Sequence, residues 1–236
     1  MNEKIPFIKF SNGELLKAGE SKRLENGELT IQKFTHGYDI ASRTSIINHL
    51  IKKNNFKKYL EIGVRKGNNF NKIEIDFKIA VDPNPLFEHK NLIKTTSDNF
   101  FKKNTTSFDL IFIDGLHLEK QVDMDIKNSL NFISKNGYIL LHDCNPPTKF
   151  HQRENYEIEG KFPAWNGTVW RSFAKLRIAD PSLSMFCVDC DWGIGIIFKK
   201  KSKPHIYEGN LTYEYLKNNR KDLLNLISVS EFINIF

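Results

Sequence analysis

The chain has 236 residues, 40% of them hydrophobic and 27% charged, which is the balance of a globular protein able to bury a core. No apolar run reaches the roughly 18 residues that a membrane-spanning helix needs, and the first residues lack the apolar stretch of a secretory signal. We therefore expect one α/β domain, cytoplasmic and without a membrane span.

The net charge of +7 suits an acidic partner, such as a nucleic acid, an anionic glycan or a phosphorylated substrate. However, the basic residues are scattered and form no stripe with interleaved aromatic residues. We therefore expect a small-molecule or glycan substrate, either neutral or anionic, and no nucleic-acid partner. Cys144, Cys187 and Cys190 are too few for a disulfide framework and are predicted to be reduced thiols.

The first part of the chain divides into a polar segment and a helix. Residues 1–40 are polar, contain several glycines and show little periodicity, which predicts an N-terminal extension or lid. Apolar residues then recur at helical spacing from residue 40 to residue 54. The main domain is expected to occupy residues 41–200.

Short apolar runs alternate with helical patterns through this domain. They predict strands at residues 59–62, 78–82, 92–95, 108–114 and 138–143. Before the last of these strands, Val122, Ile126, Leu130 and Ile133 line one face of a predicted helix that Gly137 ends. Such alternation predicts a mainly parallel sheet covered on both faces.

Residues 144–165 include three prolines and a glycine, which predict a long irregular insertion loop with a functional role. A helix at residues 169–178 and a closing hairpin at residues 184–188 and 193–198 are expected to follow. Residues 201–236 are predicted to form a C-terminal helical extension with a helix at residues 211–227. That helix would either cap the sheet or bind a second subunit, so a homo-oligomer remains open.

Ligands of an open α/β sheet bind at the carboxyl ends of its strands, and polar residues gather at these ends here. These residues are Glu61, Asp82, Ser97, Asp98, Asp114, His142 and Asp143.

The first strand leads into an E-x-G-x-x-x-G loop at residues 61–67. Gly63 and Gly67 allow a tight turn and a close approach to a ligand, and amides at the start of a following helix can hold an anion. Asp82 ends the next strand 19 residues after Gly63, where it could bond two ribose hydroxyls. This pattern indicates a cofactor that contains adenosine, and the loop is not the G-x-G-x-x-G of a dinucleotide site.

Five stretches resemble the successive motifs of class I S-adenosylmethionine-dependent methyltransferases: residues 59–70, 80–83, 96–99, 108–117 and 137–143. The resemblance implies an α/β, Rossmann-like fold with a mainly parallel seven-stranded sheet and helices on both faces. Residues 113–117 with 141–143 resemble a narrower branch, the metal-dependent sugar O-methyltransferases of macrolide biosynthesis and relatives from surface-polysaccharide clusters. Residues 166–170 and 191–195 look like later landmarks of that branch.

The resemblance implies roles for individual residues. The following residues would bind S-adenosylmethionine: Glu61, Gly63, Val64, Gly67, Asn69, Asp82, Pro83, Ser97, Asp98 and Asp114. Asn69 stands where many relatives have a serine. Asp114, His142 and Asp143 would hold a divalent metal, Mg²⁺ or Mn²⁺, and His142 departs from the acidic residue that relatives more often have.

His117 lies three residues after Asp114 and is the candidate catalytic base, with Asp114 beside it; the alternative is a loop histidine that caps the next helix. His151, Arg153, Trp165 and Arg171 are candidates for the acceptor pocket.

We expect an O-methyltransferase that acts on a hydroxyl of a sugar, a glycan or a glycosylated metabolite. Three alternatives stay open. An NAD-dependent nucleotide-sugar oxidoreductase or epimerase would usually carry a Tyr-x-x-x-Lys pair after the fourth strand, which is absent there. An Fe²⁺ site of His117, His142 and Asp143 ranks lower, because neighbours on one strand seldom both face a metal. An RNA-binding protein of the same fold is disfavoured by the scattered charge.

Overall fold

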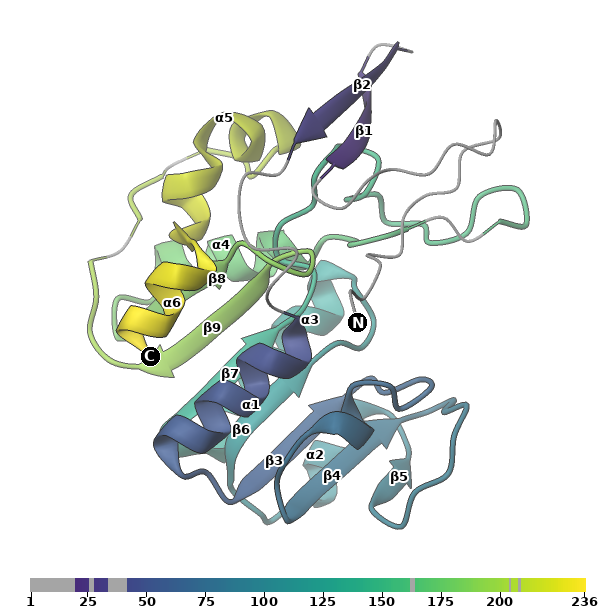
Figure 1. Ribbon diagram of the computed structural model, residues 1–236, viewed down its shortest axis with the longest axis vertical. Coiled ribbons are helices and arrows are strands. Elements are labelled where there is room, and N and C mark those ends of the chain that lie inside the picture. The colour runs from purple at the N-terminus through teal and green to yellow at the C-terminus, as the bar shows by residue number, and fades with distance from the viewer. Residues whose placement is uncertain (1–19, 26–27, 34–41, 162–163, 204, 208) are drawn as a thin grey trace.

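The computed structural model describes residues 20–25, 28–33, 42–161, 164–203, 205–207 and 209–236. An eight-stranded sheet in the order β10-β8-β9-β7-β6-β3-β4-β5 forms its centre (Figure 1). The strands of this sheet are β3 (Lys58–Ile62), β4 (Phe77–Asp82), β5 (Leu92–Lys94), β6 (Phe108–Ile113), β7 (Ile133–Leu141), β8 (Leu183–Val188), β9 (Ile194–Lys199) and β10 (Leu226–Ile227).

The sheet is mainly parallel, as the sequence predicts. Strands β5, β4, β3, β6 and β7 are parallel neighbours, whereas β9 runs antiparallel to both β7 and β8. The expected closing hairpin is therefore present. The sequence predicts seven strands, but the sheet has eight. The additional strand, β10, has only two residues, and such a short strand leaves no periodic pattern in the sequence.

Helices cover both faces of the sheet (Figure 1). Helices α1 and α6 pack on one face, and α2 to α5 pack on the other. The helices are α1 (Arg43–Asn54), α2 (Ser97–Lys103), α3 (Glu119–Phe132), α4 (Val169–Ala179), α5 (Tyr213–Leu224) and α6 (Val229–Ile235).

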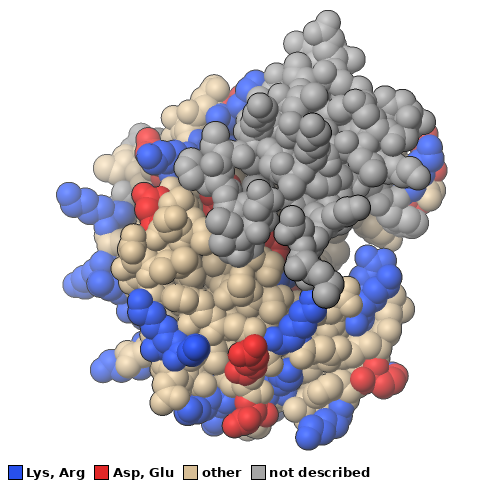
Figure 2. All heavy atoms as spheres, viewed as in Figure 1, with Lys and Arg blue, Asp and Glu red and all other residues tan. Residues whose placement is uncertain are grey.

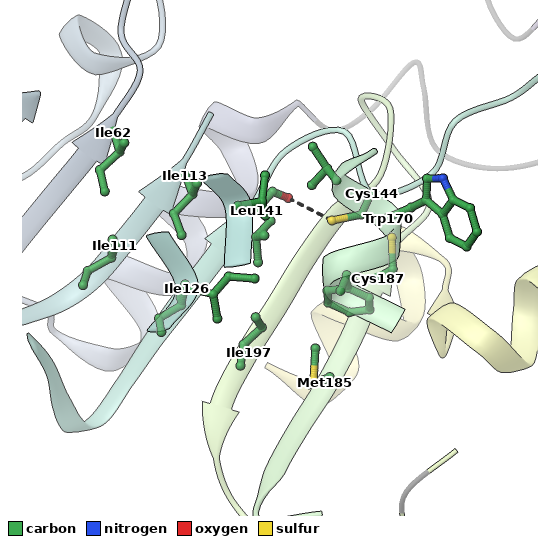
Figure 3. Close-up of a cluster of buried hydrophobic side chains, with 14 of the residues drawn as sticks. Ile62, Ile111, Ile113, Ile126, Leu141, Cys144, Trp170, Met185, Cys187 and Ile197 are labelled. Atoms are coloured by element: carbon green, nitrogen blue, oxygen red, sulfur yellow. Dashed lines mark hydrogen bonds between the residues drawn. The ribbon is translucent and has the colours of Figure 1, made fainter. Parts of the chain in front are cut away.

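Alternate residues of each strand feed the two faces. In β3, Tyr59 joins the core under α1 and α6, whereas Leu60 and Ile62 join the core under the other helices. Figure 3 shows part of that second core, in which Ile111 of β6 and Ile126 of α3 lie among strand and helix side chains. The three cysteines are free and buried, in agreement with reduced thiols.

The predicted stop of helix α3 was wrong. The helix ends at Phe132, and Gly137 lies inside β7. A Cβ atom on Gly137 would come within 2.6 Å of the carbonyl oxygen of Asp109, where β6 and β7 shift register. The glycine therefore permits a close approach of two strands, a requirement that a local helix pattern does not reveal.

The expected helix at residues 211–227 is also corrected, because the structure has two helices there. Asn225 adopts a left-handed conformation (φ 46°) that ends α5, and Ser228 begins α6 with a capping box. The two helices cover opposite faces of the sheet, so this part of the chain does cap it.

Within the predicted N-terminal extension, β1 (Glu20–Glu25) and β2 (Glu28–Lys33) form an antiparallel pair (Figure 1). Residues 1–19, 26–27 and 34–41 lie outside the described residues, and with them most of the predicted lid. The insertion loop is irregular throughout its described part, apart from one isolated bridge between Ile158 and Lys161.

In the described residues, no helix combines the length and the apolar character needed to cross a membrane. Lysine and arginine side chains are scattered over the described part of the face in Figure 2, with acidic side chains among them. The described part of this face thus repeats the scattered charge of the sequence.

Candidate active site

The carboxyl ends of four parallel strands meet at one edge of the sheet. Ile62 pairs with both Val81 and Ile113, and Ile113 pairs with Leu141. The polar residues at or just after these ends therefore emerge side by side. They are Glu61, Asp82, Asp114, His142 and Asp143.

The glycines of the first loop are required by its geometry. Gly63 has φ +81°, and a Cβ atom there would lie 2.1 Å from the carbonyl oxygen of Asp114. Gly67 has φ +69°, and its Cβ would collide with the ring of Phe87 at 2.6 Å. However, a 3₁₀ turn at Phe70–Lys72 follows this loop, so the expected α-helix start with free amides is not there.

Asp82 shapes the same loop. Its Oδ2 accepts hydrogen bonds from the amides of Val64 (2.9 Å) and Arg65 (2.8 Å), and its Oδ1 accepts one from the amide of Asn84 (2.7 Å). A carboxylate can accept about four hydrogen bonds, so one acceptor position remains for a ribose hydroxyl instead of the expected two. The neighbouring Pro83 is exposed.

Glu61 lies buried at the start of the loop in a polar chain. The hydroxyl of Tyr59 donates to it at 2.6 Å and the amide of Asn69 at 3.0 Å, and Thr44 of α1 donates to Asn69 at 2.7 Å. Burial, against the opposing hydrogen bond from Tyr59, raises the pKa of Glu61 to about 8. Thr44, which the sequence prediction did not include, thus ties helix α1 to the loop.

Ser97 and Asp98 belong to the first turn of α2, just beyond β5. The amide nitrogen of Gln121 donates to Ser97 Oγ (3.2 Å), reaches Asp98 Oδ1 (3.5 Å) and donates to Asp125 Oδ1 (3.1 Å). Asp125 is buried, and this burial raises its pKa to about 6. Gln121 and Asp125 escaped the sequence prediction because they look like ordinary polar positions of helix α3.

Two histidines and two carboxylates form a compact cluster beside this loop. His117 spans the carboxylates, with Nε2 3.3 Å from Asp114 Oδ1 and Nδ1 3.1 Å from Asp143 Oδ2. A single nitrogen of His142 contacts both carboxylates: its Nδ1 lies 3.2 Å from Asp114 Oδ1 and 2.9 Å from Asp143 Oδ2. Proton exchange with a bound hydroxyl is therefore chemically accessible at this cluster.

Arg43 and Asp191 complete the cluster, and the sequence prediction gave neither of them a role in the site. The guanidinium of Arg43 donates to Asp114 Oδ2 at 2.7 Å and to both carboxylate oxygens of Asp191. Asp191, Trp192 and Asp143 all have positive φ (43°, 67° and 62°). Aspartate adopts this conformation more readily than most residues, whereas for Trp192 it is strained, and strained backbone gathers at functional sites.

The charges in the cluster are mutually stabilised. Burial raises the pKa of Asp114, but the cations His142 and Arg43 outweigh it and hold this pKa well below its usual range. Burial lowers the pKa values of His117 and His142, but the charge of Asp143 and the contacts with Asp114 outweigh it and raise both. The histidines thus hold protons more firmly here than a free imidazole does.

Ligand atoms of Asp114, His117 and Asp143 lie within 4.8 Å of one another and could hold a metal ion. This set contains the two carboxylates that the sequence predicts as metal ligands, but it has His117 in place of His142. The Nε2 atom of His142 lies 3.4 Å from Asp191 Oδ1. One premise of the sequence analysis was wrong: neighbours His142 and Asp143 do face the same centre. They can do so because Asp143 lies beyond the end of β7 in a left-handed conformation.

The end of the insertion loop covers His117. The Trp165 ring stacks on the His117 ring with 5.0 Å between centroids, and Asn166 donates to Asp143 Oδ1 at 2.6 Å. Gly167 is so close that a Cβ atom would lie 2.0 Å from the carbonyl oxygen of His117. The loop therefore forms one wall of the site.

Two other candidates for the acceptor pocket have structural partners. Arg153 donates to the carbonyl oxygens of Phe150 (3.0 Å) and Ala164 (2.9 Å), which holds the insertion loop together. His151 Nδ1 lies 2.8 Å from Thr148 Oγ1, whereas its buried Nε2 has no partner.

Comparisons with known proteins agree with this fold. Residues 65–144 match a methyltransferase domain family, and no curated protein matches the chain. The chain is similar to a Podospora anserina methyltransferase bound to S-adenosylhomocysteine, with 19% identity over 69% of this chain and 80% of that one and a TM-score of 0.52. It is also similar to a putative caffeoyl-CoA O-methyltransferase from Staphylococcus aureus, with 19% identity over 68% and 85% of the two chains and a TM-score of 0.51.

Proposed function

Since the chain has the class I methyltransferase fold and a methyltransferase domain at residues 65–144, we propose that it transfers a methyl group from S-adenosylmethionine to a sugar hydroxyl. The acceptor would be a sugar, a glycan or a glycosylated metabolite. The reaction forms a carbon–oxygen bond, breaks the bond between the methyl carbon and the sulfonium, and releases the hydroxyl proton.

One observation carries this proposal: the loop with Gly63 touches the backbone of Asp114, three residues before His117. A cofactor held by this loop and Asp82 would therefore have its sulfonium near the cluster of histidines and carboxylates. Alignment of the acceptor oxygen with the methyl carbon would supply most of the rate enhancement.

His117 is the proposed base. Asp114 and Asp143 lie 3.3 and 3.1 Å from its two ring nitrogens, although Nδ1 makes no hydrogen bond, and the Trp165 ring stacks on the imidazole, so its orientation is restricted before an acceptor binds. A base at this place would take the hydroxyl proton as the new bond forms, a contribution on the order of 10² to 10⁴ in rate. Asp114 acts with it by orienting the ring.

The donor set of the cluster fits a divalent cation. Asp114 and Asp143 supply oxygen atoms and a histidine supplies nitrogen, a combination that suits Mn²⁺ better than Mg²⁺. A bound cation would polarise the acceptor hydroxyl and make its proton easier to remove. Either histidine could supply the nitrogen. We propose that it is His142, whose Nδ1 lies 3.2 Å from Asp114 Oδ1 and 2.9 Å from Asp143 Oδ2, because this leaves His117 to accept the proton.

An acceptor hydroxyl near His117 would meet a mixed wall. Trp165, stacked on the His117 ring, offers apolar surface, and the centroid of the Tyr156 ring lies 5.7 Å from that of Trp165. Sugars present both apolar faces and hydroxyls, and such a wall beside a polar cluster suits them. This arrangement supports a sugar acceptor over a small aliphatic one.

Radiolabelled S-adenosylmethionine should test the proposal directly. The protein is incubated with Mn²⁺ and a panel of nucleotide sugars, oligosaccharides and glycosylated macrolides, with catechol as a hydroxyl acceptor without sugar. We expect label in at least one sugar acceptor, and much less label with the variant Asp82→Ala at a concentration of S-adenosylmethionine that does not saturate it. Transfer to catechol alone would overturn the sugar assignment, and failure to bind S-adenosylhomocysteine would overturn the cofactor.

A further inference from the structure

A cavity of about 730 Å³ lies between helix α4, the insertion loop and the start of α5. The residues that line it include Glu119 but not Asp114, His117 or Asp143, so it is separate from the cluster described above. Its volume falls within the range of roughly 300 to 1,000 Å³ that is usual for small-molecule sites.

Arg171 is the unusual group in this cavity. Its side chain is partly buried, its Nε is fully buried without a partner, and the described residues offer its guanidinium no hydrogen bond or ion pair. The guanidinium lies over the Trp170 ring, with its central carbon 5.6 Å from the ring centroid. The terminal guanidinium nitrogens also have no partner in the described part of the chain but are accessible, so they could donate to two oxygens of an anion in the cavity.

The other charges around the cavity leave a positive excess near Arg171. Lys175 is already paired with Glu119 (2.9 Å) and Asp123. Lys149 is exposed and has no acidic partner among the described residues, whereas Glu214 is exposed at the start of α5. Arg171 and Lys149 are therefore the two cations available to a ligand.

The rest of the lining suits an organic ligand. Ile178, Ala179 and Leu211 supply apolar surface. Gln152, which lines the cavity, uses its Oε1 to accept a hydrogen bond from Trp170 at 3.2 Å, so its side-chain amide nitrogen is left as a donor. The cavity thus combines an anion subsite with room for a larger, less polar group.

We propose that this cavity binds a phosphate ester of nucleotide size, with Arg171 and Lys149 holding the phosphate. The ligand is distinct from the methyl donor, because the cofactor loop and Asp82 do not line the cavity. This binding does not depend on the proposed methyl transfer.

Calorimetry with the full chain tests the proposal. Uridine 5′-diphosphate, glucose 1-phosphate and uridine are titrated in the presence of saturating S-adenosylhomocysteine, so that the cofactor site is filled. We expect saturable binding of at least one phosphate ester, and binding of uridine at least about tenfold weaker than that of uridine 5′-diphosphate. Tighter binding of the diphosphate would identify a nucleotide, and tighter binding of glucose 1-phosphate would identify a sugar phosphate.

Variants then locate the site. Arg171→Met should weaken phosphate-ester binding at least about tenfold, whereas Lys200→Met, at an exposed lysine that does not line the cavity, should not change it. An unchanged affinity for S-adenosylhomocysteine shows that a variant is folded. If Arg171→Met does not bind S-adenosylhomocysteine, Lys149→Met is tested in its place. No saturable binding, or equal binding by the wild type and the folded variant, would overturn the proposal.

Discussion

Arg43 binds Asp191 with three hydrogen bonds, although 148 residues separate the two in the chain. The backbone amide and Nε of Arg43 donate to Oδ2 at 2.8 and 2.9 Å, and a terminal guanidinium nitrogen donates to Oδ1 at 3.0 Å. The other terminal nitrogen donates to Asp114. The first residue of α1 therefore fastens the loop after β8 to the end of β6.

This pairing predicts a measurable coupling. In a double-mutant cycle with Arg43→Gln and Asp191→Asn, the free energies of unfolding should deviate from additivity by about 1 to 3 kcal/mol, because charge-assisted bonds between partly buried groups are lost together. Chemical denaturation measures all four proteins. Additivity within about 0.5 kcal/mol would contradict a direct coupling.

Asp82 should matter for both the cofactor and its loop. Asp82→Ala removes the acceptor for the amides of Val64 and Arg65 as well as for a ribose hydroxyl. We expect affinity for S-adenosylmethionine to fall at least about tenfold, and Asp82→Asn, which keeps one acceptor oxygen, to fall less. Calorimetry gives both affinities, and an unchanged value for Asp82→Ala would refute the assignment of Asp82.

If His117 is the base, His117→Ala should lower kcat by on the order of 10² to 10⁴ and leave cofactor affinity nearly intact. A base must be unprotonated, so the wild-type rate should rise with pH. Asp143 and Asp114 raise the pKa of His117 despite its burial, which moves this rise above the usual range of histidine. The variant should lose that limb of the pH–rate profile.

His205 is the matched control, since its ring contacts the hydroxyl of Tyr215 at 3.2 Å and lies outside the cluster. His205→Ala should keep the wild-type profile. A wild-type kcat in His117→Ala would mean that another group, or none, removes the proton.

Removal of divalent metal should lower activity at least about tenfold, and Mn²⁺ should restore it better than Mg²⁺, because the donor set includes a histidine. Asp143→Asn should weaken Mn²⁺ binding, measured by electron paramagnetic resonance, whereas Asp76→Asn at an exposed position should not. Full activity after thorough treatment with EDTA would exclude the metal and leave the methyltransferase assignment intact.

The buried carboxylate of Asp125 should lower the free energy of unfolding at neutral pH, where it is charged. Its pKa is raised by burial from 3.8 to about 6, so folding favours the protonated form. This destabilisation is absent below pH 3.8, grows as the pH rises and is complete above about pH 6. Asp125→Asn should therefore raise the free energy of unfolding by up to about 3 kcal/mol near neutrality.

Denaturation of both proteins across this pH range measures the difference. The gain should disappear below about pH 4, where Asp125 is protonated in both states. A gain that is independent of pH would show that burial of the charge is not its cause.

The loop from Glu61 to Gly67 and the carboxylate of Asp82 could be predicted from the sequence, because a tight turn and a strand end leave local signatures. The apolar run of β6 and the helical spacing of α1 were equally readable, since a strand buried on both faces is apolar throughout and a helix buried on one face is apolar at its own period. These patterns determined the order of strands and helices along the chain. They also determined that the polar residues lie at the carboxyl ends of the strands.

Only the tertiary structure decided which polar groups meet. Arg43 and His142 each contact both Asp114 and Asp191, although the four residues come from separate segments of the chain, and these contacts depend on how those segments pack. The left-handed backbone of Asp143 depends likewise on its surroundings, where the amide of Asn145 bonds to the carbonyl oxygen of Trp192 at 2.8 Å. Periodicity records the burial of one residue at a time, whereas a charge cluster is a property of pairs that are distant in sequence, and a single chain carries no local trace of it.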